Sequence, residues 1–307
     1  MSKEIKNIDL VILGGGPAGL TSAIYASRAR MKMILLENAF LGGQVRNSYL
    51  IENYPGFKNI DGASLADKMQ EQAEEAGAII DEFDPVVDIK LTKDEKIIET
   101  ESYIYNTKTV VIATGAVPKR LPIPSEEKFS GRGIHYCAVC DGAMYSDKIV
   151  GVVGGGNAAL EEAVFLSRFA KKVYIIRRYD YFRSERSVFD EANNNSKIEI
   201  LYNEDLVDVT GEEFVQRARL KNTITEKERE IEIDAVFGYI GTEPKTKEFE
   251  KYIDLTSSGY IIADEMMKTN VPGVFAAGDV RDKVYRQITT AVADGTIAAL
   301  EAEKYIK

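Results

Sequence analysis

The chain has 307 residues, 45% of them hydrophobic, which suits two compact cores and excludes a disordered or fibrous protein. Its formal net charge of −10 at pH 7 argues against nucleic acid or an anionic membrane as partner, because both attract clustered Lys and Arg. No stretch approaches the roughly 18 apolar residues that span a bilayer, and no signal-peptide core follows Met1, so we expect a cytoplasmic protein.

The first predicted unit is a strand, a glycine turn, a helix and a second strand. An apolar run at 10–13 precedes Gly14, Gly16 and Gly19, which have the GxGxxG spacing. In that spacing the first glycine allows a tight turn, the second lets the backbone approach a pyrophosphate, and the third allows close helix packing. Glu37 ends the next apolar run, where a carboxylate accepts hydrogen bonds from a ribose diol and repels a phosphate. This unit therefore predicts a site for FAD or NAD.

The next informative strand, at 110–118, ends in glycine and proline. Such an exit is typical of a chain that leaves a sheet, so this point is a candidate domain crossing.

Cys137 and Cys140 are the two cysteines of the chain, and His135 is its one histidine, so the chain alone cannot supply a four-ligand Cys/His zinc site. We expect no metal. Two thiols at this spacing can close a small disulfide, and the close partner lowers one thiol pKa so that a nucleophilic thiolate exists near neutral pH. Asp141 is placed to shuttle the proton that this chemistry requires. The alternatives are buried unreactive thiols or half of a metal site.

A second unit repeats the first at an offset of 140 residues, since 150–177 aligns with 10–37. Gly154, Gly156 and Ala159 satisfy the GxGxxA variant of the glycine spacing, again between an apolar strand and a helix. Recurrence in the required context favours two dinucleotide sites over purely structural glycines.

The residues that end the second strand of this repeat differ in charge from those of the first copy. Arg177 and Arg178 stand there, and Arg183 follows, which offers forked cationic donors suited to a 2′-phosphate and so predicts NADP. The alternative is a solvated charge run, because Asp180 and Glu185 mix the signs nearby.

The remainder of the chain continues the α/β pattern. We expect strands at 198–202 and 231–236, a strand end with a Gly/Pro exit at 237–244, an apolar strand and glycine turn at 273–280, and a helix from Thr290 onward. Asp279 would then lie at the carboxyl end of a strand, where open α/β sheets bind ligands.

The two exits near 118 and 245 bracket the second repeat. They predict one domain made of residues 1–118 and 246–307, and a second domain, 119–245, inserted into it. The predicted fold class is α/β, with two Rossmann-like dinucleotide-binding domains of the three-layer ββα type.

Over essentially its whole length the chain resembles the low-molecular-weight thioredoxin reductase family. The resemblance rests on several motifs: 14–19 (GGGPAG), 42–44 (GGQ), 52–56 (ENYPG), 113–115 (ATG), 137–142 (CAVCDG), 154–159, 278–280 (GDV) and 285–287 (YRQ).

The resemblance implies a homodimeric enzyme that reduces thioredoxin or a thioredoxin-like protein. It implies that Cys140 exchanges electrons with the flavin, that Cys137 attacks the thioredoxin disulfide and that Asp141 handles protons. It also implies that the inserted domain rotates between two orientations. The residues that would bind FAD are Gly14, Gly16, Pro17, Ala18, Gly19, Glu37, Gly43, Gln44, Asn53, Ala113, Thr114, Gly115, Gly278, Asp279, Arg286, Gln287 and Ile288. The residues that would bind NADPH are Gly154, Gly156, Asn157, Ala158, Arg177, Arg178 and Arg183.

The chain departs from the family where NADPH would bind. The family's His-Arg-Arg motif falls on Arg177, Arg178 and Tyr179, so a tyrosine replaces one phosphate-binding arginine. We favour NADPH as donor, because the second glycine turn is intact and three arginines remain. The alternative is a ferredoxin-dependent flavin thioredoxin reductase, which shares the fold and the CxxC. Two further classes are a flavin-dependent electron transferase between ferredoxin and pyridine nucleotide, and a flavin redox sensor.

Overall fold

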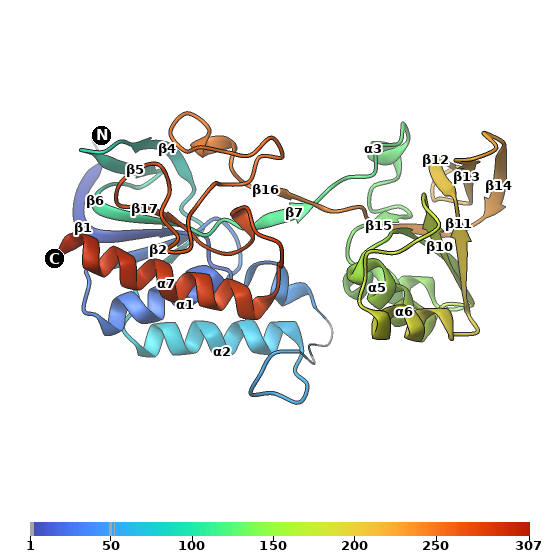
Figure 1. Cartoon of the computed structure of the whole chain (residues 1–307), viewed down its shortest axis with the longest axis horizontal. Coiled ribbons are helices and arrows are strands. Elements are labelled where there is room, and N and C mark those ends of the chain that lie inside the picture. Colours follow the sequence, from blue (N-terminus) through green and yellow to red (C-terminus); the bar gives the residue numbers. More distant parts are fainter. Residues whose placement is uncertain (1–2, 49–50, 52) are drawn as a thin grey trace. The chain divides into compact units, whose positions relative to one another are not determined.

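The computed structural model describes residues 3–48, 51 and 53–307, except for the side chains of residues 139 and 140. The chain divides into two compact units (Figure 1): unit 1 is Met1–Val117 with Glu243–Lys307, and unit 2 is Pro118–Thr242. Where the chain passes from one unit to the other, β7 (Ala116–Pro118) pairs with β16 (Thr242–Pro244).

Unit 1 is organised around a parallel sheet. β1 runs between β2 and β6, with Leu10–Leu13 in register with Met33–Leu36 on one side and with 109–112 on the other. These segments are apolar and buried on both faces, as parallel strands covered on two sides require. The parallel strands are β1 (Glu4–Leu13), β2 (Met33–Glu37), β3 (Ile80–Glu82), β6 (Tyr103–Ile112) and β17 (Val274–Ala276).

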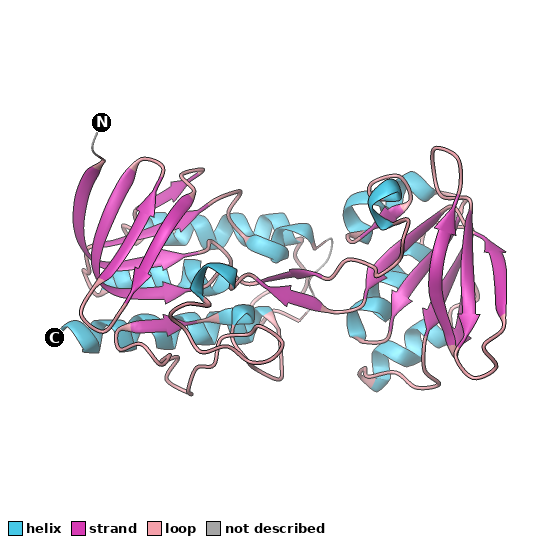
Figure 2. Cartoon of the chain, turned by 90° about the horizontal axis from the view of Figure 1, so that it is seen from above, coloured by secondary structure: helices cyan, strands magenta, loops and turns pink. Residues whose placement is uncertain are grey.

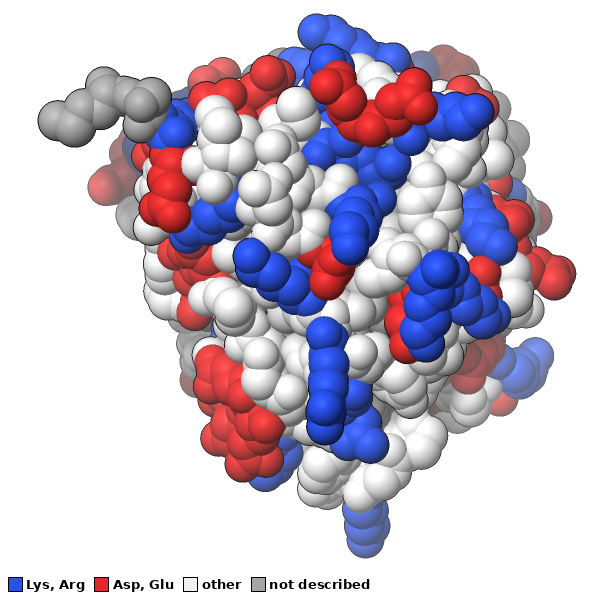
Figure 3. Space-filling view, turned by 90° about the vertical axis from the view of Figure 1, so that its left-hand side faces the viewer, with Lys and Arg blue, Asp and Glu red and all other residues white. Residues whose placement is uncertain are grey.

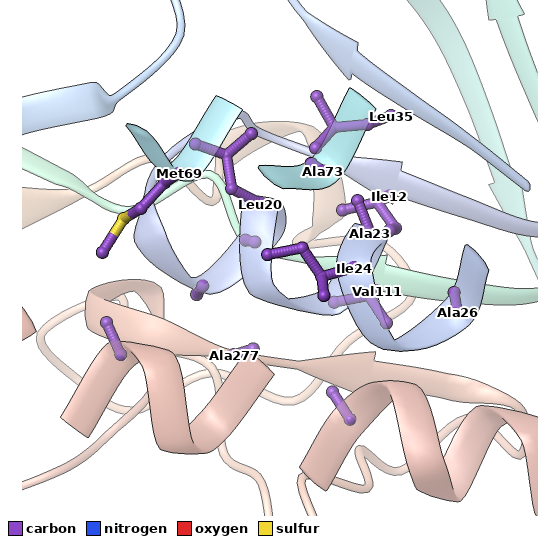
Figure 4. Close-up of a cluster of buried hydrophobic side chains, with 14 of the residues drawn as sticks. Ile12, Leu20, Ala23, Ile24, Ala26, Leu35, Met69, Ala73, Val111 and Ala277 are labelled. Carbon is purple, nitrogen blue, oxygen red and sulfur yellow. The ribbon is translucent and has the colours of Figure 1, made fainter. Parts of the chain in front are cut away.

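Helices cover one face of this sheet. α1 (Pro17–Arg28), α2 (Gly62–Glu75) and α7 (Ile288–Ile306) lie side by side there (Figure 1). Figure 4 shows part of the core between these helices and the sheet, where Leu20 and Ala23 of α1 lie close to Ile12 of β1 and Leu35 of β2. Small residues on α1 and α7 allow these helices to approach closely, since a Cβ at Gly295 would lie 2.2 Å from the Ala18 carbonyl oxygen.

The opposite face of the sheet packs against a second apolar layer. An antiparallel meander of β4 (Val86–Leu91) and β5 (Lys96–Thr100) continues into β6 and contributes Ile89 and Ile98 to the core on this side. Phe249 of the 3-10 helix η3 (Lys247–Phe249) joins the same core. Unit 1 therefore has the predicted three layers, and its fold class is confirmed.

Unit 2 repeats this plan on a smaller scale (Figure 2). A parallel sheet with the order β11-β10-β9-β15-β8 has helices on one side and the antiparallel sheet β12-β13-β14 on the other, each with its own apolar core. The sheet strands are β8 (Ile134–His135), β9 (Ile149–Gly154), β10 (Lys172–Arg177), β11 (Ile198–Tyr202) and β15 (Ala235–Tyr239). The covering elements are α5 (Asn157–Ser167), α6 (Arg186–Asn193), β12 (Glu204–Thr210), β13 (Arg217–Asn222) and β14 (Glu228–Glu232).

Short helices complete the architecture. Those of unit 2 are α3 (Glu126–Phe129), α4 (Ala138–Asp141) and η2 (Gly142–Tyr145), and those of unit 1 are η1 (Gly43–Asn47) and η4 (Gly278–Val280).

One predicted strand is wrong in its extent. The expected strand 231–236 is divided, because β14 ends at Glu232 and β15 begins at Ala235. Asp234 explains the break: its side chain accepts a hydrogen bond from the Ile149 N–H at 2.8 Å, and its own N–H donates to the Ile149 carbonyl at 2.7 Å. The chain thereby leaves the small antiparallel sheet and enters the parallel one.

Charged side chains of both signs share the surface that Figure 3 shows, where blue and red groups are interspersed with white areas. Among the helices of the described residues, none combines the length and apolar character needed to cross a bilayer.

Candidate active site

The first glycine turn, between β1 and α1, allows a close approach to the backbone. Gly14 has a φ of +105°, and a Cβ at Gly19 would lie 1.8 Å from the Gly14 carbonyl oxygen, so neither position accepts a side chain. A Cβ at Gly16 would meet nothing within 4 Å, and Gly16 is the N-cap of α1 with Pro17 just inside the helix. The turn therefore leaves open space in front of a helix N-terminus, which favours an anion.

Glu37 lies at the end of β2, beside this turn. Its carboxylate accepts hydrogen bonds from the Gly15 N–H at 2.8 Å and from the Ala39 N–H at 3.1 Å. Gly43 begins η1 on the other side, where a Cβ would lie 3.3 Å from the Gly16 Cα, and both Gly43 and Gln44 are exposed. The structure thus brings the predicted carboxylate and the predicted GGQ motif to the same turn.

A second set of polar side chains lies in the segment between β17 and α7. Asp279 has a buried carboxylate oxygen without a hydrogen-bond partner among the described residues, and burial raises the pKa of this carboxyl. A Cβ at Gly278 would lie 2.9 Å from the Ala18 Cβ, so η4 packs against the start of α1. The Asn53 amide donates to the Gln287 side-chain oxygen at 3.2 Å. Residues from three distant parts of the sequence therefore meet around α1 and α7.

Arg286 directly precedes Gln287 in the chain. Its guanidinium lies 4.1 Å from the centre of the Tyr260 ring, and its Nε is buried without a hydrogen-bond partner in the part of the chain that the structure describes. Ile288, also predicted to contact the flavin, is the first residue of α7.

The third predicted segment follows β6 directly. The Ala113 N–H donates to the Leu13 carbonyl at 2.7 Å, and the Thr114 hydroxyl donates to the Lys245 carbonyl at 2.7 Å. Gly115 has a φ of +67°, which lets the chain turn there toward β7.

The cysteines of unit 2 stand at the short helix α4. Cys137 precedes the helix and is half-buried, and the Ala138 N–H donates to the Tyr239 hydroxyl at 2.9 Å. Cys140 belongs to α4, but its side chain lies outside the described residues. The disulfide expected between the two sulfurs therefore stays a prediction.

The histidine of the chain links two polar groups behind α4. His135 is buried, with Nδ1 3.0 Å from Asp141 Oδ2 and Nε2 2.8 Å from the Tyr145 hydroxyl, and its ring stacks on Phe237. Burial lowers the pKa of His135, so the ring is neutral near pH 7, and burial raises the pKa of Tyr145 to about 12. A neutral ring that accepts from Tyr145 at Nε2 donates its Nδ1–H to Asp141.

The second glycine turn, between β9 and α5, repeats the geometry of the first. A Cβ at Gly154 would lie 2.5 Å from the Tyr239 carbonyl oxygen and 2.7 Å from the Ala159 Cβ, so this glycine is required. A Cβ at Gly156, the N-cap of α5, would have nothing nearer than the Arg183 carbonyl at 3.8 Å. Tyr239 therefore contacts the glycine turn through its carbonyl and the CxxC helix through its hydroxyl.

A family model described as pyridine nucleotide-disulphide oxidoreductase matches residues 8–295. The chain is 51% identical over 304 residues to the "34.2 kDa protein in rubredoxin operon" of Clostridium pasteurianum, with 99% of both chains covered. It is 41% identical to the solved thioredoxin reductase of Lactococcus lactis in its FR conformation, with a TM-score of 0.94 and coverage of 97% and 99%. The chain belongs to the low-molecular-weight thioredoxin reductase family. The predicted resemblance is thereby confirmed.

One of the similar solved structures is named after a different electron donor, ferredoxin. A solved ferredoxin-flavin thioredoxin reductase from Clostridium acetobutylicum is 32% identical to this chain, with 99% of both chains covered and a TM-score of 0.54. Membership in the thioredoxin reductase family therefore establishes a flavin-dependent disulfide oxidoreductase, and the donor and acceptor are finer questions.

FAD is the bound group that membership in this flavoprotein family implies, and unit 1 offers groups that fit it. The open face of Gly16 at the N-terminus of α1 suits a pyrophosphate, and the Glu37 carboxylate suits a ribose diol. The unpartnered oxygen of Asp279 suits a hydroxyl donor such as a ribityl chain. The individual roles of the predicted FAD residues stay predictions.

Three polar residues close to the CxxC helix of unit 2, His135, Tyr145 and Tyr239, were not predicted from the sequence. His135 served only to exclude zinc, although its position two residues before the CxxC is a usable signal. Tyr145 and Tyr239 gave no such signal, because their proximity to α4 and His135 depends on how η2 and β15 pack. Tyr239 is linked to Ala138 across 101 residues of sequence.

Proposed function

We propose that this chain is a thioredoxin-disulfide reductase. Electrons from a reduced nicotinamide nucleotide pass by way of FAD to the Cys137/Cys140 pair and then to thioredoxin or a thioredoxin-like protein. The observation that supports this most is the position of the CxxC at α4. Tyr239 connects α4 to the second glycine turn, and His135 lies against Asp141, the residue that follows Cys140. FAD would bind to residues 1–118 and 246–307 and the nucleotide to 119–245, and the family resemblance implies a homodimer.

The cysteine chemistry balances as two exchanges. FAD, when bound, supplies the electron pair that reduces the cysteine disulfide. The Cys137 thiolate attacks one sulfur of the thioredoxin disulfide, so that an intermolecular S–S bond forms and the other thioredoxin sulfur leaves as a thiolate that takes up a proton. Cys140 then attacks the Cys137 sulfur, the Cys137–Cys140 bond forms, and the second thioredoxin sulfur leaves. Thioredoxin gains two electrons and two protons, and the cysteine pair loses them.

Asp141 is the group assigned to proton delivery in these exchanges. It is half-buried directly after Cys140, and its carboxylate faces the Nδ1 of His135 at 3.0 Å. Because His135 is buried, stacked on Phe237 and bonded to Tyr145, it holds the Asp141 carboxylate in one orientation. His135 therefore acts as a positioning residue.

Two serine variants test this function. Cys140→Ser retains the attacking Cys137 but cannot resolve the mixed disulfide, so thioredoxin should become covalently attached and the adduct should appear on a non-reducing gel. Cys137→Ser should form no adduct and should fail to reduce thioredoxin, while its flavin is still bleached anaerobically by dithionite. Full turnover by Cys137→Ser would refute the proposal.

A second candidate differs only in the donor. Tyr179 replaces a family arginine, and a ferredoxin-flavin thioredoxin reductase is among the similar structures, so reduced ferredoxin is the alternative to a nicotinamide nucleotide. Anaerobic rapid mixing distinguishes them. The sequence favours NADPH, and a nicotinamide nucleotide should bleach the flavin within the turnover time. Rapid bleaching by reduced ferredoxin alone would favour the second candidate.

A further inference from the structure

We infer that the nucleotide site of unit 2 does not select for a 2′-phosphate and takes NADH at least as readily as NADPH. The inference rests on the proposed function, in that unit 2 binds a nicotinamide nucleotide, and it departs from the sequence-based preference for NADPH. Four residues that flank the end of β10 carry it: Arg177, Arg178, Tyr179 and Asp205.

The Arg177 guanidinium, which would have to donate hydrogen bonds to a 2′-phosphate, already has partners within the chain. Its Nε donates to the Tyr181 carbonyl at 2.7 Å, and its guanidinium lies 4.9 Å and 5.4 Å from the ring centres of Tyr179 and Tyr181. The guanidinium also fills the space beside the turn, because a Cβ at Gly155 would lie 2.3 Å from its Cζ. Arg177 therefore packs against the glycine turn with one donor spent on a carbonyl and a face covered by tyrosines.

Arg178 is held by a carboxylate. One of its terminal nitrogens donates to both carboxylate oxygens of Asp205, at 2.9 Å and 3.2 Å. Asp205 lies on β12, which packs beside the end of β10, and the pair is about half exposed to solvent. A 2′-phosphate at Arg178 would have to displace the Asp205 carboxylate or stand beside it, and two anions at such short separation repel each other.

The third position contributes no cation. Tyr179 stacks on Tyr181 with 5.5 Å between ring centres, and Asp180 beside it is exposed. Arg183 is exposed, and the described part of the chain offers its side chain no ion-pair partner. A single exposed arginine does not form the convergent set of forked donors that distinguishes a phosphate from a hydroxyl.

The same arrangement suits an unphosphorylated ribose. The hydroxyls of a diol both donate and accept, and the Arg178–Asp205 pair presents a donor and an acceptor side by side. In unit 1, the Glu37 carboxylate occupies the corresponding place beside its own glycine turn, where it accepts from the Gly15 N–H. Unit 2 thus also presents a carboxylate near the end of the second strand of its repeat, supplied by β12 rather than by β10.

Isothermal titration calorimetry with NAD⁺ and NADP⁺ tests this inference on the flavin-loaded full chain. Neither oxidised nucleotide reduces the flavin, so the readout is binding and not turnover. We expect the wild type to bind NAD⁺ at least as tightly as NADP⁺. Asp205→Asn frees Arg178 and should improve NADP⁺ binding about tenfold with less than threefold change for NAD⁺. Tyr179→Arg, a second variant on the exposed surface, should shift binding in the same direction.

Glu199→Gln is the matched control, because it removes one negative charge from an exposed ion pair with Lys172 at the opposite end of β10. It should leave the ratio of the two affinities unchanged. Tighter binding of NADP⁺ than NAD⁺ by the wild type would overturn the inference, as would an unchanged ratio in both Asp205→Asn and Tyr179→Arg. Failure of both nucleotides to bind would also overturn the inference. The proposed disulfide reduction would still be tested separately, because the serine variants can be assayed with dithionite as reductant.

Discussion

Glu162 on α5 carries a carboxylate oxygen that is buried without a hydrogen-bond partner among the described residues. Burial, with a smaller contribution from the neighbouring Glu161 charge, raises the pKa of Glu162 to about 7. Between the ordinary glutamate pKa and this value, the folded state holds a proton that the unfolded state releases. Glu162 therefore contributes stability that is fully present at acid pH and is lost as the pH rises through about 7.

Glu162→Gln tests this sign. The amide cannot ionise, so the variant should gain stability over the wild type as the pH rises, by on the order of 2 kcal/mol between about pH 5 and about pH 8. Denaturant unfolding of both proteins at the two pH values measures the difference. A stability difference that is the same at both pH values would contradict the account of Glu162.

His135 offers a second test at the scale of the residue. His135→Ala removes the group that holds Asp141 and should slow thioredoxin reduction about tenfold, because a misoriented proton donor is less effective. His135→Asn retains an N–H that can reach Asp141 and should restore most of the rate. Steady-state assays with saturating thioredoxin measure this rate, and flavin bleaching by dithionite is the control. Equal losses in both variants would argue that His135 only supports the fold.

At the scale of the element, the two glycine turns separate a packing requirement from a binding requirement. Gly19 cannot accept a Cβ because the Gly14 carbonyl lies 1.8 Å from that position, whereas the position above Gly16 is open. Gly154 and Gly156 divide in the same way in unit 2. In each turn one glycine lets the helix pack on its strand, and another leaves room in front of the helix N-terminus.

Alanine at each position of the first turn should therefore give opposite results. Gly19→Ala should lower the free energy of unfolding by about 3 kcal/mol, because the helix must shift from β1. Gly16→Ala should change it by less than about 1 kcal/mol and yet lower the flavin content, because the methyl group fills space that a pyrophosphate requires. Denaturant unfolding and visible absorbance per mole of purified chain measure the two quantities. Normal flavin content in Gly16→Ala would contradict the assignment of this turn.

At the scale of the whole molecule, the duplicated strand–turn–helix pattern could be predicted from the sequence, because it depends on local periodicity and on glycines that tolerate no side chain. The side-chain partners that distant segments supply in unit 2 could not be predicted. From the sequence, Arg178 is a candidate phosphate ligand, but in the structure its guanidinium is paired with Asp205 of β12. The sequence likewise gives no partner for Asp141, whereas in the structure its carboxylate faces His135 of β8. Such contacts follow from sheet order, which the chain's local pattern leaves open.

In the proposed reaction, one flavin and one cysteine pair act in series. Anaerobic dithionite titration of the purified, flavin-loaded chain measures this most directly, because it counts the electrons taken up per flavin without reference to any natural donor. We predict that the wild type takes up twice as many electrons per flavin as Cys137→Ser before both are fully reduced, since the variant has no disulfide to reduce. Equal uptake by the two proteins would contradict the account.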